Sequence, residues 1–388
     1  MKMPFIDLKH QYQLHKGAFD NAVHAVLNHG QYIHGPEVTE FENQLQRFAN
    51  VRHAVTCGNG TDALVLALQA MHLQKGDVVF VPSLTFAATA EAVAICGGIP
   101  FFVDIDGKTY NLDTKSLKEA VFEAQKQSLK AVGIIAVDLF GLAADYTAIN
   151  DIAKENNLWV MSDCAQGFGC THNGHMVCSC HDCTIATTSF FPAKPLGCYG
   201  DGGAVFTNDD EVDTLIRSLR EHGKGSEKYD NVRIGYNSRL DTMQAAILIE
   251  KLKLFPEEIA LRNKIAERYT QAFQSRFQTP LHPANDTCVW AQYTLKKTDP
   301  SARKQAMEEF GSRGIPTVIY YPKPLHLQTA YKHFPHANDM SACEHVSQTV
   351  FSLPMSPYLT EEEVGEVCEV SEDKVLNESL RFCRHIRL

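Results

Sequence analysis

The segment IATTSFFPAKPLGCYGDGGAVFT, residues 185–207, predicts two buried strands joined by a loop that carries one constrained lysine. Its two ends, Ile185–Ser189 and Gly203–Thr207, are short and apolar, as buried strands are. Between them Lys194 stands among two prolines and several aromatic residues. These neighbours restrict the backbone and partly desolvate the amine, so we expect a lowered pKa suited to covalent chemistry. Most lysines are solvated surface charges, and the flanking prolines set Lys194 apart from them.

Before this segment, from residue 51 onward, short apolar runs alternate with longer stretches that favour helix. The other strand candidates are Ala54–Thr56, Val78–Val81, Pro100–Val103, Ala131–Val137 and Leu158–Ser162. Helices are predicted at Asp62–Met71 and Ala87–Cys96. Strands that are apolar throughout, rather than alternating, are typical of a parallel sheet with helices on both faces. The sequence therefore predicts a large α/β domain with a mostly parallel central sheet.

The remainder of the chain predicts a smaller C-terminal α+β domain. Residues 241–273 are rich in helix formers, and Pro256 is expected to divide them into two helices. Strand-like Cys288–Leu295, a helical stretch at 301–313 and the apolar run Pro316–Tyr321 follow. We place the boundary near residue 250, which gives a large domain over residues 1–250 and a small one over 251–388.

The turn CGNGTDAL, residues 57–64, separates the first strand from a helix whose cap we expect at Thr61 or Asp62. Backbone N–H groups at a helix start are free to bind a phosphate, so Gly60 and Thr61 are candidate phosphate contacts. A plain turn that needs glycine for its backbone angles is an equally open interpretation. The glycine spacing also resembles the nicotinamide fingerprint, but the acidic residue that should end the next strand is missing.

The segment LWVMSDCAQGFG, residues 158–169, ends a strand on Asp163. Open parallel sheets bind ligands at the carboxyl ends of their strands, although an isolated aspartate there is more often a turn cap. A phosphate turn, this carboxylate and Lys194 are together the groups that pyridoxal 5'-phosphate requires. Ser189 adds a hydroxyl for the phosphate, and Phe86 is placed either to cover one face of the ring or to pack in the core.

Another candidate segment, RIGYNSRLDTMQAA, residues 233–246, holds Asn237 and Arg239 just before a helix. An Asn-Ser-Arg turn is usually a capping device. It is also placed to reach a phosphate or carboxylate that belongs to a neighbouring subunit.

Composition excludes several classes of protein. The 388 residues contain 36 lysines and arginines against 46 aspartates and glutamates, a formal net charge of −10, which argues against general nucleic-acid binding. The apolar stretch from Ala92 to Val103 is far shorter than a membrane span. Charged residues near the N-terminus disfavour a secretory signal, so we expect a cytoplasmic protein whose 12 cysteines stay reduced.

The motifs together resemble the DegT/DnrJ/EryC1/StrS family of sugar aminotransferases, over about nine-tenths of the chain from Phe5 to Tyr358. The stretches that carry the resemblance are GQYIHGPEVTEFE (30–42), GNGTDAL (58–64), DLFGLAADY (138–146), DCAQGFG (163–169), SFFPAKPLGCYGDGGA (189–204), GYNSRLDTMQAA (235–246) and GIPTVIYYPKPLHLQ (314–328). The resemblance implies a fold-type I transferase that depends on pyridoxal phosphate and is active as a homodimer with shared sites.

The resemblance also assigns roles to residues of this sequence. It makes Lys194 the lysine that forms the Schiff base with the cofactor and Asp163 the partner of the pyridine nitrogen. Gln166 would contact the ring hydroxyl, and Phe86 would stack on the ring. The phosphate would be held by Gly60, Thr61 and Ser189, with Asn237 contributed by the second subunit. Arg239 and His326 would lie near the sugar nucleotide.

The implied reaction moves an amino group from L-glutamate to the keto carbon of a nucleotide-linked sugar. The stretch around Lys194 most resembles members that act on UDP-linked N-acetylated sugars, including 3-keto uronic acids, and a 4-keto-6-deoxy sugar is the closest alternative. A cofactor-binding regulator without turnover is a hypothesis of another class. The Cys- and His-rich residues 170–183 lack the paired spacing of a zinc site, so we predict no metal.

Overall fold

A seven-stranded sheet forms the centre of the computed structural model, which describes residues 3–227, 229–281 and 285–371. The strand order is β1-β9-β8-β5-β4-β2-β3. The strands are β1 (His53–Cys57), β2 (Val78–Pro82), β3 (Ile99–Val103), β4 (Ala131–Val137), β5 (Trp159–Asp163), β8 (Ile185–Ser189) and β9 (Gly203–Thr207). Only β9 runs antiparallel to its neighbours. The predicted α/β class with a mostly parallel sheet is therefore confirmed.

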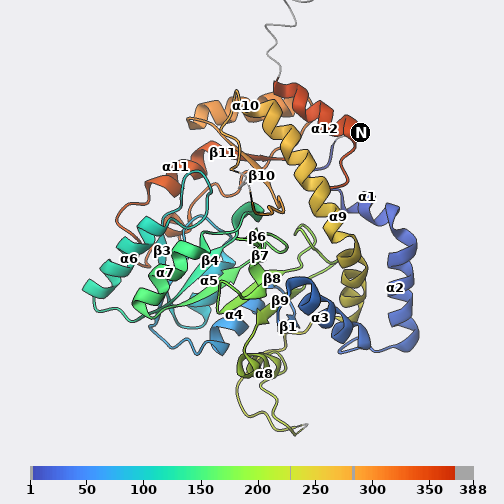
Figure 1. The fold of residues 1–388 in the computed structure, drawn as a ribbon, viewed down its shortest axis with the longest axis vertical. Helices are drawn as coiled ribbons and strands as arrows, with labels where there is room; N and C mark the ends of the chain where they lie inside the picture. Colours follow the sequence, from blue (N-terminus) through green and yellow to red (C-terminus); the bar gives the residue numbers. More distant parts are fainter. Residues whose placement is uncertain (1–2, 228, 282–284, 372–388) are drawn as a thin grey trace, which may run out of the picture.

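Helices surround this sheet and explain why its strands are apolar (Figure 1). They are α4 (Gly60–Ala70), α5 (Ala88–Ile95), α6 (Thr114–Lys126), α7 (Tyr146–Asn156) and α8 (Asp210–Leu219). Helix α4 packs on β8 and β9, the two strands that flank the lysine loop. Strands β2, β8 and β9 are buried along their whole length. The start of α4 is therefore held firmly beside the end of β8.

The helix α9 (Thr242–Phe273) is continuous, so the predicted break at Pro256 is wrong. A proline inside a helix costs roughly 3 kcal/mol because it removes one hydrogen bond and crowds the preceding turn. Here the proline is exposed, while Phe255, Glu258 and Arg262 on the same helix are buried. Packing along the length of the helix compensates for the local defect, as two N-terminal helices, α2 (Lys16–His29) and α3 (Pro36–Ala49), lie against α9 (Figure 1).

A second apolar cluster lies at the far end of α9 and includes Tyr269, Phe273, Trp290, Phe310 and Phe351. Around it are β10 (Tyr293–Lys296), β11 (Val350–Leu353), α10 (Pro300–Ser312) and α12 (Glu361–Cys368). The helix α11 (Ser341–Thr349) instead packs its buried apolar residues into the core around the main sheet. Strand β10 is shorter than the predicted Cys288–Leu295. The domain boundary near residue 250 stays a prediction, because α9 runs through this position. Residues 372–388 of the predicted C-terminal domain lie outside the described residues.

The Cys- and His-rich segment begins with a small hairpin of β6 (Thr171–His172) and β7 (His175–Met176). Among the residues that the structure describes, no three His, Cys, Asp or Glu side chains gather as a metal site would require. In the same described ranges, no helix has the length and apolarity to cross a bilayer.

Candidate active site

A cavity of about 480 Å³ opens where several strands of the sheet end. Asp163 is the last residue of β5, Ser189 the last of β8, and Gly60 the first of α4. This is the edge at which open α/β sheets bind ligands, and the volume lies in the usual range for small-molecule sites. Seven of the residues predicted from the sequence line the cavity: Gly60, Thr61, Phe86, Asp163, Gln166, Ser189 and Lys194.

Lys194 projects into this cavity from the loop between β8 and β9. Its backbone N–H donates to the Phe191 carbonyl at 2.9 Å, which folds the loop into a tight turn. Burial lowers the pKa of the Lys194 amine, and the nearby Asp163 carboxylate partly opposes this shift. Because a lowered pKa increases the fraction of uncharged amine, Lys194 is suited to act as a nucleophile and as a base.

Asp163 is a buried carboxyl group, 5% exposed. Its Oδ2 accepts a hydrogen bond from Thr89 Oγ1 at 2.8 Å, and its Oδ1 accepts one from the Ala165 N–H at 3.2 Å. Burial raises the pKa of Asp163, while these two donors and Lys194 act in the opposite direction. A carboxyl group whose pKa is raised by burial would be stabilised in its ionised form by a positive partner, such as the protonated ring nitrogen of a bound cofactor.

The start of α4 lies directly against the end of β8. A Cβ atom at Gly60 would come within 2.6 Å of Ser189 Cβ, so only glycine permits this approach. The contact brings the free N–H groups of the helix start beside the Ser189 hydroxyl, as a phosphate site requires. The helix cap predicted at Thr61 or Asp62 lies slightly earlier, because the Asn59 side chain accepts from the Asp62 N–H at 2.8 Å.

Gln166 is held in one orientation by its hydrogen bonds. Its Oε1 accepts from the Phe140 N–H at 2.9 Å, and its Nε2 donates to the Tyr321 hydroxyl at 3.2 Å. Since the carbonyl oxygen is already engaged by the backbone, the amide nitrogen is the group left to donate to a ligand. This arrangement is compatible with the predicted contact to a ring hydroxyl.

Phe86 lies on the wall of the cavity and is 56% exposed in the single chain. Its ring centroid is 6.4 Å from that of Tyr321. The alternative of a core phenylalanine is therefore wrong, because a core ring would be buried. Its stacking on a cofactor ring stays a prediction.

Three predicted residues do not line the cavity. Asn237 is exposed and pairs with Glu221 through a backbone bridge, and Arg239 is partly exposed on the same segment. His326 is buried, with Nδ1 at 2.7 Å from Ser83 Oγ and Nε2 at 3.1 Å from Glu344 Oε1. Both of its ring nitrogens are thus engaged within the chain. The predicted roles of all three stay predictions.

Sequence reasoning missed Thr89 and Tyr321, which both line the cavity. Thr89 follows Phe86 by one helical turn, so a helix through LTFAATA would have placed it on the same side. Tyr321 offers no local signal, because it reaches the cavity from a distant part of the chain. Burial raises the pKa of Tyr321 above its ordinary range, so its hydroxyl keeps its proton.

The residues of the cavity fit pyridoxal phosphate. The aldehyde of the cofactor would meet a lysine with a lowered pKa, and its ring nitrogen would face a buried carboxyl group with a raised pKa. Its phosphate would lie at a helix start where glycine permits a close approach. Fold and site together define a fold-type I transferase that depends on pyridoxal phosphate.

The chain belongs to the DegT/DnrJ/EryC1/StrS aminotransferase family, whose model matches residues 14–371. A UDP-2-acetamido-2-deoxy-3-oxo-D-glucuronate aminotransferase from Pseudomonas aeruginosa is 44% identical over 365 residues, which cover 94% of this chain and 98% of that protein.

Solved structures of similar proteins agree with this assignment. The crystal structure of a DegT DnrJ EryC1 StrS aminotransferase from Brucella abortus superposes with a TM-score of 0.92 at 45% identity, covering 95% of this chain and 98% of that one. NtdA from Bacillus subtilis, solved with bound cofactor PMP, superposes with a TM-score of 0.85 at 28% identity, covering 95% and 84% of the two chains.

Proposed function

We propose that this chain moves an amino group from L-glutamate to the keto carbon of a UDP-linked N-acetylated ketosugar. The observation that carries the proposal is the meeting of Lys194 and Asp163 in one cavity of an aminotransferase fold. A UDP-2-acetamido-3-keto uronic acid is the first candidate substrate, because the similar Pseudomonas aeruginosa protein is named for such a sugar. The product would serve surface polysaccharide or glycan synthesis.

The residues that would hold the cofactor divide among its chemical groups. Lys194 would bind the aldehyde, Asp163 would face the ring nitrogen, and the backbone of Gly60 and Thr61 with the Ser189 hydroxyl would hold the phosphate. When bound, pyridoxal phosphate supplies an electron sink for the carbon that gains or loses the amino group.

Lys194 has a second task, which is to carry a proton at its Nζ. The loss of the glutamate amino group and the gain of the sugar amino group each require a proton to move, and a positioned amine does this in both directions. The lowered pKa of Lys194 supports this role, because an amine that stays protonated cannot accept a proton. Asp163 would stay ionised beside the positive ring nitrogen of the bound cofactor and would thereby keep that nitrogen protonated.

A direct test follows the absorption band of the cofactor on Lys194. We expect L-glutamate to abolish the band, with release of 2-oxoglutarate, and a UDP-linked 3-keto uronic acid to restore it. A panel of UDP- and dTDP-linked 3-keto and 4-keto sugars would separate this substrate from a 4-keto-6-deoxy sugar. A band that glutamate leaves unchanged would instead support a cofactor-binding regulator.

Dimerisation and location belong to the same proposal. Asn237 and Arg239 lie outside the cavity of their own chain, which supports a homodimer in which that segment reaches the partner's site. We place the enzyme in the cytoplasm, with small charged metabolites as substrates.

A further inference from the structure

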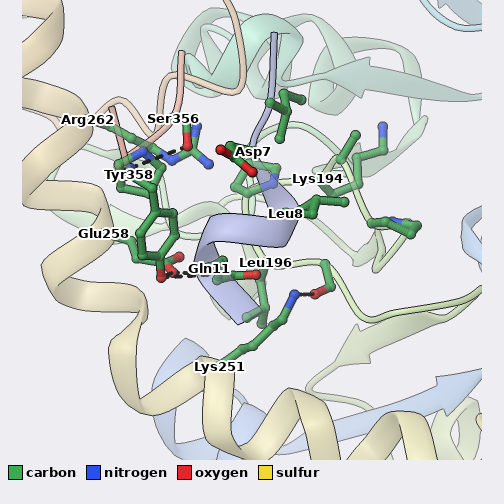
Figure 2. Close-up of a pocket in the computed structure, with 16 residues that line it drawn as sticks. Asp7, Leu8, Gln11, Lys194, Leu196, Lys251, Glu258, Arg262, Ser356 and Tyr358 are labelled. Carbon is green, nitrogen blue, oxygen red and sulfur yellow. Dashed lines mark hydrogen bonds between the residues drawn. The ribbon is translucent and has the colours of Figure 1, made fainter. Parts of the chain in front are cut away.

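Behind the lysine loop lies a second, much smaller cavity of about 20 Å³ (Figure 2). It is enclosed by α1 (Leu8–Leu14), the loop residues 192–197, the middle of α9 and residues 356–358. Helix α9 contributes Lys251, Glu258 and Arg262 to its wall, all of them buried. Figure 2 shows the Lys194 side chain leading away from this polar group. The loop therefore has the cofactor cavity on one side and ionisable groups of α9 on the other.

Lys251 is the group of α9 that contacts the loop directly. Its side chain is 2% exposed, and its Nζ donates to the Gly197 carbonyl at 2.6 Å. The same Nζ lies 3.9 Å from the centroid of the Tyr199 ring, a favourable cation–π contact. Burying an ammonium group is costly unless such partners compensate for lost water. An apolar side chain at this position would avoid that cost. The presence of an amine here therefore indicates a functional role.

The Gly197 carbonyl is a rigid point of attachment for the loop. A Cβ atom at Gly197 would come within 2.6 Å of the Phe191 and Pro192 carbonyl oxygens, so the two arms of the loop are in close contact. The Cys198 N–H also donates to the Phe190 carbonyl at 2.8 Å. In so compact a loop, a displacement of Gly197 is passed on to Lys194, three residues earlier.

Helix α9 also holds the loop at a second backbone group. Gln244 Oε1 accepts a hydrogen bond from the Tyr199 N–H at 2.9 Å. Gln244 and Lys251 are two helical turns apart and therefore share one face of α9. The helix thus engages the loop at one carbonyl and at one N–H.

The charges around Lys251 come from its own helix and from the loop. Burial lowers the pKa of Lys251 to about 8, while the Glu258 carboxylate and the Cys198 thiol act in the opposite direction. Glu258 is itself held by Gln11 Nε2 at 2.9 Å and by the Tyr358 hydroxyl. The principal hydrogen-bond partner of Lys251 is therefore a neutral carbonyl of the loop.

We propose that Lys251 is a positioning residue for transamination, which holds the Gly197 carbonyl and thereby fixes Lys194 in the cofactor cavity. This inference rests on the proposed function of Lys194. Proton transfer depends on the placement of the amine, and a displacement of about 1 Å costs up to about 100-fold in rate. Loss of the contact should therefore lower kcat more than it weakens the binding of substrates.

The test compares Lys251→Met with Lys253→Met in protein loaded with pyridoxal phosphate. Methionine keeps much of the lysine volume and removes the donor, while Lys253 is an exposed lysine of the same helix paired with Glu250. For Lys251→Met we expect kcat to fall by about 10- to 100-fold with KM for L-glutamate within about threefold of wild type. We also expect the visible circular dichroism of the bound cofactor to change. Lys253→Met should match wild type in all three.

A Lys251→Met protein with wild-type kcat and wild-type visible circular dichroism would overturn the proposal, even with a lower Tm. If that variant does not fold, Lys251→Gln takes its place, since its amide stays polar on a shorter, uncharged side chain. Borohydride reduction followed by peptide mass analysis of the wild type tests Lys194 independently. Cofactor fixed elsewhere would refute the proposed function itself, whereas cofactor fixed on Lys194 leaves only the role of Lys251 in question.

Discussion

Burial acts on Lys194 and Asp163 in opposite directions. It lowers the pKa of the lysine and raises that of the aspartate, so both groups are pushed toward their neutral forms. For the lysine this is an advantage, because the neutral amine is the reactive form. For the aspartate it creates a need for a positive partner, which the protonated ring nitrogen of a bound cofactor would meet. The two shifts therefore prepare the cavity for the same ligand.

Replacing Lys194 tests the central assignment. We expect Lys194→Ala to lose at least about 1,000-fold in kcat and to lose the absorption band of the lysine-bound cofactor. The cavity wall should remain, so the Tm should change little. Absorption spectra and assays of 2-oxoglutarate release measure both effects. Lys304→Ala, at an exposed site, is the control, and full activity in Lys194→Ala would refute the assignment.

Thr89 should influence the pH below which activity falls, because its hydroxyl donates a hydrogen bond to Asp163. Its hydroxyl hydrogen bond lowers the pKa of the carboxyl group, so removing that bond moves this pKa upward. The carboxylate is then protonated at a higher pH. We expect Thr89→Val to shift the acid limb of the kcat profile toward higher pH. Thr214→Val, at an exposed position of α8, is the control, and an unchanged or downward-shifted limb would contradict this account.

The contact between α4 and β8 shows how two pieces of secondary structure make one binding feature. Their approach at Gly60 and Ser189 combines unpaired N–H groups with a hydroxyl. The close packing of α4 on β8 and β9 keeps them together.

A methyl group at Gly60 should damage this feature. Alanine usually stabilises a helix relative to glycine by up to about 1 kcal/mol, but here its Cβ would collide with Ser189. We expect Gly60→Ala to weaken pyridoxal phosphate binding by about 10-fold or more, as measured by fluorescence titration of the apoprotein. Gly365→Ala in α12, where nothing lies within 4 Å, should leave binding unchanged. Equal affinities for both variants would argue against a phosphate site here.

The predicted roles of Asn237 and Arg239 depend on how two subunits are arranged. Their segment follows α8, and neither residue lines the cavity of the same chain. Ser238, which stands between them, holds the segment beside the start of α4, because its Oγ accepts from the Gly58 N–H at 3.0 Å and donates to Asp62 Oδ2 at 2.6 Å. In a twofold dimer the same surface of each subunit faces its partner, so one segment can complete the other site. The single chain thus presents most of a site, and we infer that a second chain completes it.

Mixed dimers can show whether sites are shared. We expect Lys194→Ala and Asn237→Ala to be nearly inactive alone. After unfolding and refolding as an equal mixture, half of the dimers should be mixed, and each should contain one intact site. Activity should therefore recover to about a quarter of the wild-type value. No recovery, with mixed dimers verified by mass spectrometry, would place Asn237 in the site of its own chain.

Much of the fold could be predicted because its strands are short, apolar and separated by helical stretches. Pro256 was misjudged because a local rule was applied to a helix that packing on α2 and α3 holds together. Gly60, Asp163 and Ser189 were found because each stands at the end of a strand or the start of a helix, and Lys194 because two prolines and aromatic residues surround it in the sequence. Tyr321 was missed because its place depends on a distant contact with Gln166.

The amino-acid sequence by itself determined the alternation of strands and helices, the family and the identity of the lysine and aspartate, because these depend on local pattern and residue chemistry. The tertiary structure alone decided which side chains share the cavity, which way Gln166 faces and what lies behind Lys194. The physical reason is the distance along the chain over which each effect acts. Periodicity and backbone preference act over a few residues, whereas burial and hydrogen bonding between α9 and the lysine loop exist only once the chain has brought them together.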